Sequence, residues 1–246
     1  MFLTSERLNF FTPQPRLVQG NTTTLLHFDN SIADSSGYNI TWTLDANATY
    51  TTTNKFGGNS LAANNASANS YYAITSSTSA YEWGTGDFTV EGWVYRTGTT
   101  AQSACIFDSR PNGNGSAGQK RGFVMWVSGG GNCIEVGYSG GGAGYTTMRV
   151  TSAGLLSTGA WHHIAYSRSS GTGRIFIDGT QSGANVSDSN NYGYQTAWAT
   201  PTRTTCIGQF IDASQVVYGY IDEARVSKTA RYTANFTAPS AAFVND

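Results

Sequence analysis

Carboxylates are the side chains of this 246-residue chain that could cleave a sugar bond. Glycosidic hydrolysis needs two carboxyl groups that flank the scissile bond, about 5 to 9.5 Å apart. The close acidic pairs of note are Glu82 with Asp87 and Asp222 with Glu223. Neighbouring residues on a strand point to opposite sheet faces unless a bulge intervenes, so Asp222 and Glu223 would not share a cleft. We therefore expect a non-catalytic protein rather than a glycoside hydrolase.

Histidines offer a second kind of chemistry, in which a base activates a nucleophile. His162 and His163 are consecutive in a strand-like run, and no recognisable Ser or Cys elbow lies near them in the sequence. The glycine-rich stretches 129–131 and 140–144 are not followed by the Lys-Ser/Thr of a phosphate-binding loop. These patterns predict structural histidines and ordinary turns.

A polar loop with three aromatic rings, residues 185–198, is the best candidate for ligand binding. Sugars stack their apolar ring faces on aromatic side chains, while Asn, Asp and Gln bond their hydroxyl groups. The predicted glycan-binding residues are Tyr192, Tyr194 and Trp198 of this loop, with Trp126, Tyr138 and Tyr145 from strands and a glycine-rich loop. The alternative is that these rings cover a sheet face or a subunit contact.

The elements that position these residues are predicted to be strands. Charged residues make up only 12% of the chain, and Gly, Ser, Thr and Asn are abundant, which favours short strands joined by tight turns. The length suits one sandwich or barrel domain. The net charge of −1 gives no electrostatic footprint for nucleic acid or an anionic membrane. We therefore expect neither partner.

Alternation is clearest in residues 88–95, where Phe88, Val90, Gly92 and Val94 would face one side of a sheet. Thr89, Glu91, Trp93 and Tyr95 would face the other. Further strands are expected at Thr24–Asp29, Ala104–Asp108, Gly122–Val127, Cys133–Tyr138, Thr146–Val150, Trp161–Arg168, Arg174–Asp178, Thr204–Gly208 and Gly219–Val226. About a dozen strands suffice for two packed antiparallel sheets.

Residues 1–20 form a separate unit, because apolar residues are mixed there with Pro13 and Pro15, without strand or helix periodicity. We expect an extended arm that docks on a neighbouring subunit or on the domain itself. The first residues do not read as a secretory signal, and no segment reaches the length of a membrane span. Cys105, Cys133 and Cys206 lie in apolar strand-like runs, which predicts free buried thiols.

Three motifs carry a family resemblance: Trp161-His162-His163-Ile164-Ala165-Tyr166-Ser167-Arg168, Arg174-Ile175-Phe176-Ile177-Asp178-Gly179, and the run from Gly219 to Tyr232. Together they resemble the last third of a laminin-G-like domain of the concanavalin A-like lectin and glucanase superfamily. The resemblance extends over about residues 24 to 243. It implies an all-β, two-sheet antiparallel jelly-roll sandwich in residues 21–246, with the arm at residues 1–20. A laminarinase-type Glu-x-Asp-x-x-Glu run is missing from the sequence.

The resemblance also implies a structural Ca²⁺, which members of the family often hold between the opening and closing strands. By motif, the ligands would be Asp29, with Asp222 or Glu223, and Asp34 from the following turn. The alternative is that these carboxylates accept hydrogen bonds from backbone N–H groups or from Arg225.

The closing segment, residues 227–239, resembles the end of laminin-G-like domains in structural proteins of tailed bacteriophages. It implies a virion protein, or otherwise an extracellular one, that binds host glycans through its lectin-like domain. The arm would contact other virion proteins, in a homo-oligomer or a larger assembly. The alternative is a purely structural decoration or assembly protein without a ligand.

Overall fold

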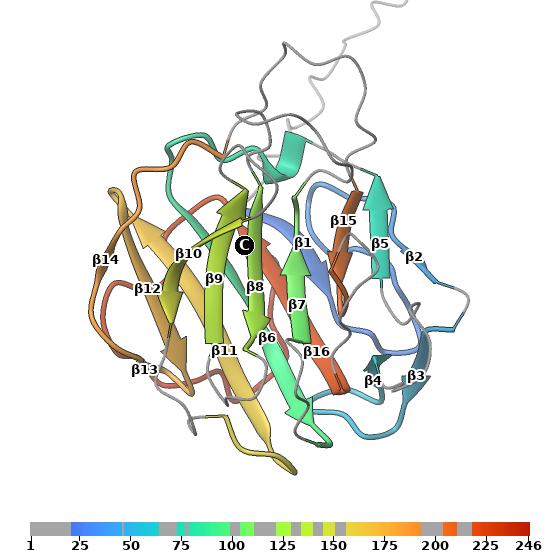
Figure 1. Cartoon of the computed structure of the whole chain (residues 1–246). Coiled ribbons are helices and arrows are strands. Elements are labelled where there is room, and N and C mark those ends of the chain that lie inside the picture. Colours follow the sequence, from blue (N-terminus) through green and yellow to red (C-terminus); the bar gives the residue numbers. More distant parts are fainter. Residues whose placement is uncertain are drawn as a thin grey trace, which may run out of the picture.

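The computed structural model of the chain describes residues 21–45, 47–63, 73–76, 79–98, 104–110, 122–128, 134–139, 145–150, 156–192, 204–210 and 218–246. These residues form two antiparallel sheets packed face to face (Figure 1), so the predicted all-β sandwich is confirmed. The described part contains one short 3-10 helix, η1 (Ser79–Tyr81), and no helix that is long and apolar enough to cross a membrane. The predicted arm at residues 1–20 lies outside the described residues.

The two sheets have seven and nine strands. The seven-stranded sheet, in front in Figure 1, has the order β10 (Tyr145–Val150), β9 (Ile134–Ser139), β8 (Phe123–Val127), β7 (Ala104–Asp108), β15 (Thr204–Ile207), β5 (Ala73–Ser76) and β2 (Thr43–Leu44). The nine-stranded sheet behind it has the order β13 (Thr180–Gln181), β12 (Thr172–Ile177), β11 (Trp161–Ser169), β6 (Phe88–Arg96), β16 (Gly219–Ser227), β4 (Ser60–Ala63) and β3 (Thr49–Thr51). Two further strands join it, β1 (Thr22–Leu26) beside β16 and β14 (Val186–Ser187) beside β12.

The core lies between the sheets, and β6 shows how the sequence forms it. Phe88, Val90 and Val94 belong to the central apolar cluster, whereas Trp93 belongs to a separate cluster on the outer face. The predicted alternation of β6 is therefore confirmed. Phe88 stacks on Trp83 with ring centroids 4.0 Å apart, and such aromatic pairs add to the stabilisation from buried area.

Two tight turns fix the registers beside β12. Ser170 and Gly171, both at positive φ, close the hairpin from β11 to β12. Asp178 and Gly179 adopt the same left-handed region after β12, with φ of 50° and 80°. A Cβ at Gly179 would overlap the carbonyl oxygen of Phe236, so this position requires glycine.

Residues 228–246, here called the C-terminal segment, pack on part of the outer face of the nine-stranded sheet. The ring of Phe236 stacks on Tyr232 at 3.6 Å and contacts the ring of His163 at 5.7 Å. Phe243 lies 6.0 Å from the same imidazole. The part of the outer face around His163 is therefore sealed from solvent.

The predicted free thiols are confirmed for Cys105 and Cys206, whose buried side chains form no disulfide. Burial raises the pKa of Cys206 above its usual value, so its thiol is kept neutral. Cys133 lies outside the described residues.

Candidate functional site

Two of the predicted glycan-binding rings are buried, which corrects that part of the sequence analysis. Tyr192 is 1% exposed, and its ring packs 5.2 Å from Phe88 in the central core. Its hydroxyl lies 3.1 Å from a carboxylate oxygen of Asp188, which satisfies the buried phenol. Trp126 is also 1% exposed. A sugar cannot stack on a ring that solvent does not reach.

The remaining predicted residues are only partly placed. Tyr138 lies in β9 and Tyr145 in β10, where Tyr145 pairs with Ser139. Their side chains, and all of Tyr194 and Trp198, lie outside the described residues. The predicted glycan site therefore stays a prediction for these four positions.

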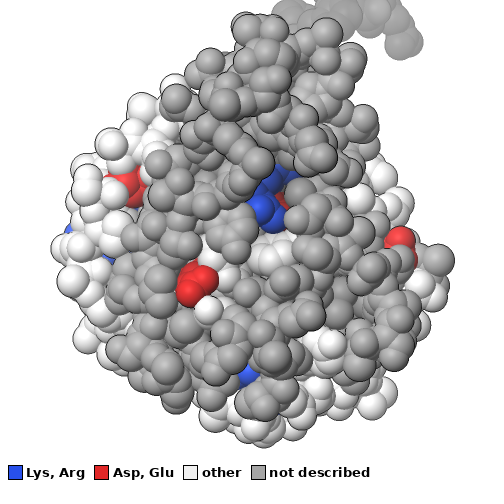
Figure 2. Space-filling view, viewed as in Figure 1, with Lys and Arg blue, Asp and Glu red and all other residues white. Residues whose placement is uncertain are grey.

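Trp126 stands on the outer face of the seven-stranded sheet, in a cluster with Cys105, Val124 and Phe210. Beside this cluster, Arg110 forms an ion pair of 2.6 Å with the buried carboxylate of Asp108, and its guanidinium stacks 4.9 Å from the Phe210 ring. The guanidinium is therefore already neutralised by Asp108. Figure 2 views this face, on which the described residues show separate charges and no continuous charged patch.

Partly exposed aromatic rings gather instead on the outer face of the nine-stranded sheet. Trp161 of β11, Tyr95 of β6 and Tyr220 of β16 lie opposite one another on three adjacent strands. The Tyr95 ring centroid is 5.6 Å from that of Trp161 and 5.5 Å from that of Tyr220. All three side chains are partly exposed. We call these residues the aromatic row.

A second group of rings and a cation lie on the same face. Trp93, two residues before Tyr95, packs edge-on against Phe56 at 5.7 Å. The Lys55 ammonium lies 4.0 Å from the Trp93 ring centroid, within the range of a cation–π interaction. Trp93 itself is only 4% exposed, so beyond the aromatic row this face offers the partly exposed Phe56 ring and the Lys55 ammonium, a hydrogen-bond donor. A partly exposed ring beside a donor suits stacking against a polyhydroxylated ring. The aromatic row is not visible in the sequence, because only the strand register aligns these residues.

The predicted metal ligands fall into two groups. Asp29 accepts hydrogen bonds from the N–H groups of Gly58 and Asn59, at 2.6 and 3.0 Å. Asp222 accepts those of Lys55 and Phe56, at 2.8 and 3.2 Å. One loop, residues 55–59, therefore connects the two carboxylates.

Glu223 lies beside Asp222 in this group of carboxylates, whereas Asp34 lies in a different turn. Both Glu223 oxygens lie within 3.0 Å of His27 Nδ1, and Oε2 accepts the N–H of Phe243 at 2.7 Å. A bulge in β16, with Glu223 at a φ of 53°, interrupts the alternation between Asp222 and Arg225. Asp34 instead accepts the N–H groups of Leu25, Ser36 and Ile40 and so closes the turn after β1.

The donors around these carboxylates decide how well they fit Ca²⁺. Burial raises the pKa of Asp222 to about 7, and the bonds from Lys55 and Phe56 offset this only in part. The hydrogen bond to Glu223 raises the pKa of His27 against the effect of burial. Within the described ranges, no three His, Cys, Asp or Glu side chains are grouped so that they could hold a metal ion. Backbone N–H groups occupy the positions where Ca²⁺ would need oxygens free. The calcium site therefore stays a prediction.

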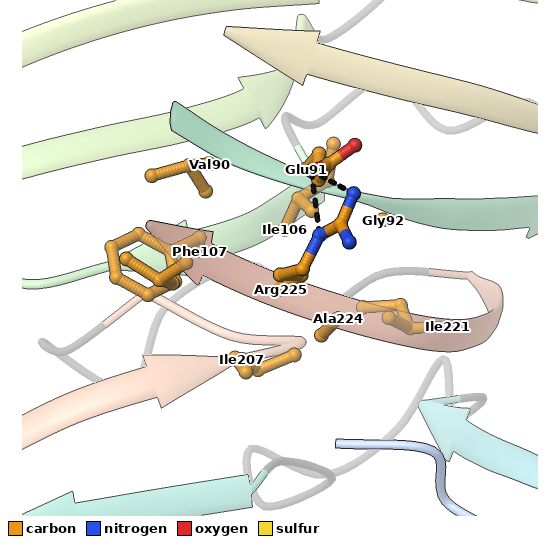
Figure 3. Close-up of a pocket in the computed structure, with 10 residues that line it drawn as sticks. Val90, Glu91, Gly92, Ile106, Phe107, Ile207, Ile221, Ala224 and Arg225 are labelled. Carbon is orange, nitrogen blue, oxygen red and sulfur yellow. Dashed lines mark hydrogen bonds and ion pairs between the residues drawn. The ribbon is translucent and has the colours of Figure 1, made fainter. Parts of the chain in front are cut away.

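One cavity between the sheets is too small for a ligand. It measures about 10 Å³ and is lined by apolar side chains that include Val90, Ile106 and Ile207 (Figure 3). This volume is at the lower limit for one water molecule, and an apolar lining disfavours water. Figure 3 also shows the Glu91–Arg225 ion pair, which is directed away from these apolar side chains.

The two histidines of β11 have different environments. His163 is fully buried, and its Nε2 lies 3.1 Å from the carboxylate of Glu91, which confirms the predicted structural role for this residue. His162 is partly exposed, and its Nε2 lies 2.8 Å from Ser157 Oγ. The sequence analysis missed Ser157 because it belongs to no elbow motif and precedes the strand.

Comparison with known proteins agrees with this fold. No curated protein sequence matches the chain. Domain 4 of AbnA, a GH43 extracellular arabinanase from Geobacillus stearothermophilus solved in complex with arabinotriose, is similar over 86% of this chain and 94% of that domain, with 16% identity and a TM-score of 0.58. The binding domain of botulinum neurotoxin DC, in complex with rat synaptotagmin II, has 12% identity and a TM-score of 0.61. A sialidase from Trypanosoma rangeli has 13% identity and a TM-score of 0.55.

The last two matches cover 86% of this chain but only 49% and 31% of the longer structures. At such identities the likeness extends to the fold alone. A family profile, described as the concanavalin A-like lectin/glucanases superfamily, matches residues 66–235 and so covers more than half of the sequence. The chain belongs to the concanavalin A-like lectin and glucanase superfamily.

Proposed function

We propose that this domain binds glycans without cleaving glycosidic bonds, and that the aromatic row is its main contact surface. One observation carries the proposal: Trp161, Tyr95 and Tyr220 lie side by side on three strands and are partly exposed on an outer sheet face. Rings in a rigid sheet are already ordered, so binding costs little conformational entropy.

The comparisons support a binding role in outline. The arabinanase domain that this chain resembles was solved with an oligosaccharide, and the toxin domain is named as a binding domain. The carboxylates of Asp222 and Glu223 are engaged by N–H groups and by His27, rather than placed across a cleft. This argues against the two-carboxylate chemistry of a glycosidase.

The test is binding of an oligosaccharide panel to the wild type and to Tyr95→Ala and Tyr220→Ala, measured by glycan array and calorimetry. Each variant should bind the best wild-type ligand at least about tenfold more weakly, about 1.4 kcal/mol, because it loses one stacking surface. Tyr38→Ala is the matched control, since Tyr38 is also partly exposed but lies in the turn after β1 and should leave binding unchanged.

Two outcomes would contradict the assignment. Unchanged affinity in both tyrosine variants, with loss of binding in Trp198→Ala, would move the site to the loop of residues 185–198. Binding to no oligosaccharide by a correctly folded wild type would remove the glycan function altogether.

We further propose that the domain stands on the surface of a phage particle and contacts host glycans there. The proposal is supported by the likeness of residues 227–239 to laminin-G-like domains of phage structural proteins. The competing role is a decoration protein that residues 1–20 hold in the assembly. Deletion of residues 1–20 should abolish incorporation into particles and leave oligosaccharide binding intact. Full incorporation of the truncated chain would contradict a role for the arm.

A further inference from the structure

We propose that Ser157 is a nucleophile that cleaves small acyl esters, with His162 as its general base and Asp178 as the partner that orients His162. This activity goes beyond glycan binding, because it acts on ester bonds and uses none of the residues of the aromatic row. Its basis is a continuous chain of two hydrogen bonds, 2.8 Å from Ser157 Oγ to His162 Nε2 and 2.7 Å from His162 Nδ1 to Asp178 Oδ2.

The bond to Asp178 determines the tautomer of His162. An ionised carboxylate only accepts hydrogen bonds, so Nδ1 of the imidazole must carry the proton that it shares with Asp178. In the neutral ring, Nε2 then holds the lone pair, and it accepts the hydroxyl proton of Ser157. This is the arrangement in which histidine acts as a general base toward serine.

Both ends of this hydrogen-bond network, Ser157 and Asp178, are held by contacts with strands. Asp178 Oδ1 accepts the N–H of His163 at 2.9 Å, and the N–H of Asp178 donates to the carbonyl of His163 at 2.8 Å. The loop of Ser157 is held by Arg96, whose Nη1 donates to the Leu156 carbonyl at 2.9 Å. The Arg96 carbonyl also accepts the N–H of Gly159 at 2.8 Å. The three groups are therefore positioned before a substrate arrives.

A substrate can reach these three residues from solvent. Ser157 is exposed, and the side chains of His162 and Asp178 are 14% and 46% exposed. Among the described residues, none accepts a hydrogen bond from the N–H of Thr158. This N–H follows the nucleophile directly, and a backbone N–H without a partner is the kind of donor that stabilises an oxyanion.

The reaction needs no group beyond these residues and water. The Ser157 hydroxyl proton moves to His162 Nε2 as Oγ bonds to the ester carbonyl carbon. The carbon–oxygen bond to the alcohol then breaks, and the alcohol leaves with the proton from Nε2. Water gives a proton to Nε2 and attacks the acyl-serine, which releases the carboxylic acid and returns the proton to Oγ.

Ser157 and His162 are the catalytic residues, and Asp178 is a positioning residue. The substrates would be small and flexible esters, such as acetate esters, because Ser157 is exposed to solvent. His163, next in the sequence, cannot act in this way, because it is fully buried against Glu91.

The test combines a fluorophosphonate probe, located by mass spectrometry, with hydrolysis of p-nitrophenyl acetate. The probe should label Ser157 in the wild type. Ser157→Ala should abolish labelling and the specific hydrolysis, and His162→Gln should lower kcat about 10²-fold, as expected for loss of a general base. Asp178→Asn keeps the oxygen that accepts the His163 N–H, and Asn tolerates the left-handed backbone. It should therefore lower kcat with unchanged KM and unchanged melting temperature.

Ser35→Ala, a change of another exposed serine, is the control and should leave labelling and hydrolysis unchanged. Failure of the probe to label Ser157 in folded protein would overturn the proposal, as would equal hydrolysis by wild type and Ser157→Ala. Either result would mean that these two hydrogen bonds only hold the loop of Ser157 and the turn at Asp178 against β11. Oligosaccharide binding by Ser157→Ala keeps this outcome separate from the glycan function.

Discussion

Glu91 and Asp222 are buried carboxylates on adjacent strands, and their surroundings differ. Glu91 on β6 meets the guanidinium of Arg225 at 2.8 Å, the imidazole of His163 at 3.1 Å and the hydroxyl of Tyr232 at 2.8 Å. Asp222 on β16 accepts only backbone N–H groups from the described residues, including that of Glu223 at 2.9 Å.

The difference moves the two pKa values in opposite directions. Burial opposes ionisation of both groups. At Glu91, the hydrogen bond from His163 and the charge of Arg225 outweigh burial, so the pKa lies below the usual value. At Asp222, the N–H groups do not outweigh it, and the pKa rises to about 7. Backbone N–H groups alone therefore do not replace a full positive charge, which Glu91 has beside it in Arg225 and Asp222 lacks among its described hydrogen-bond partners.

The largest expected effect is therefore at Glu91. Glu91→Ala leaves Arg225 and His163 buried without their anion, and removal of one partner from such a network typically costs about 3–5 kcal/mol. Urea unfolding should show this loss of stability. Glu135→Ala, which removes a partly exposed glutamate from β9, is the matched control and should change stability by less than about 0.5 kcal/mol. A loss below about 1 kcal/mol in Glu91→Ala would contradict the proposed importance of the network.

The pH dependence of stability gives a second test of the network around Glu91. Because the pKa of folded Glu91 is lowered, its stabilisation is fully present above the ordinary value of 4.5 and is lost as the pH falls through the folded pKa. Wild-type stability should therefore fall in this acidic window, and Glu91→Gln should lack that component. Parallel pH curves for the two proteins would contradict the assignment.

The sequence predicted features that depend on local alternation. The two faces of β6 and the buried thiols of Cys105 and Cys206 follow from residue type and spacing. Each depends on the alternation of neighbouring residues along a strand.

Features that depend on long-range register or irregular backbone could not be predicted. The bulge at Glu223 puts a non-glycine residue at positive φ, and no local signal requires it. Trp126 and Tyr192 are residue types that are common in sugar-binding sites, yet packing buries both side chains. The aromatic row and the contact of Ser157 with His162 need strands and loops to be placed before any pairing is visible.

A smaller effect is expected at Asp222, where the sequence predicted a calcium site. If Ca²⁺ binds Asp29 with Asp222 or Glu223 in the native state alone, it stabilises the fold by about 2.7 kcal/mol at a hundredfold excess over Kd. Chelator should then lower the melting temperature of calcium-loaded wild type but not of Asp222→Asn combined with Glu223→Gln.

Asp87→Asn is the control for this experiment, because Asp87 bonds Ser170 in the turn after β11 and should leave the response to chelator intact. Identical melting of the wild type with calcium and after its removal would exclude the metal. The loop of residues 55–59 would then offer only its N–H groups to Asp29 and Asp222. Because the pKa of Asp222 is about 7, a proton rather than a metal ion would neutralise this carboxylate as the pH falls through 7.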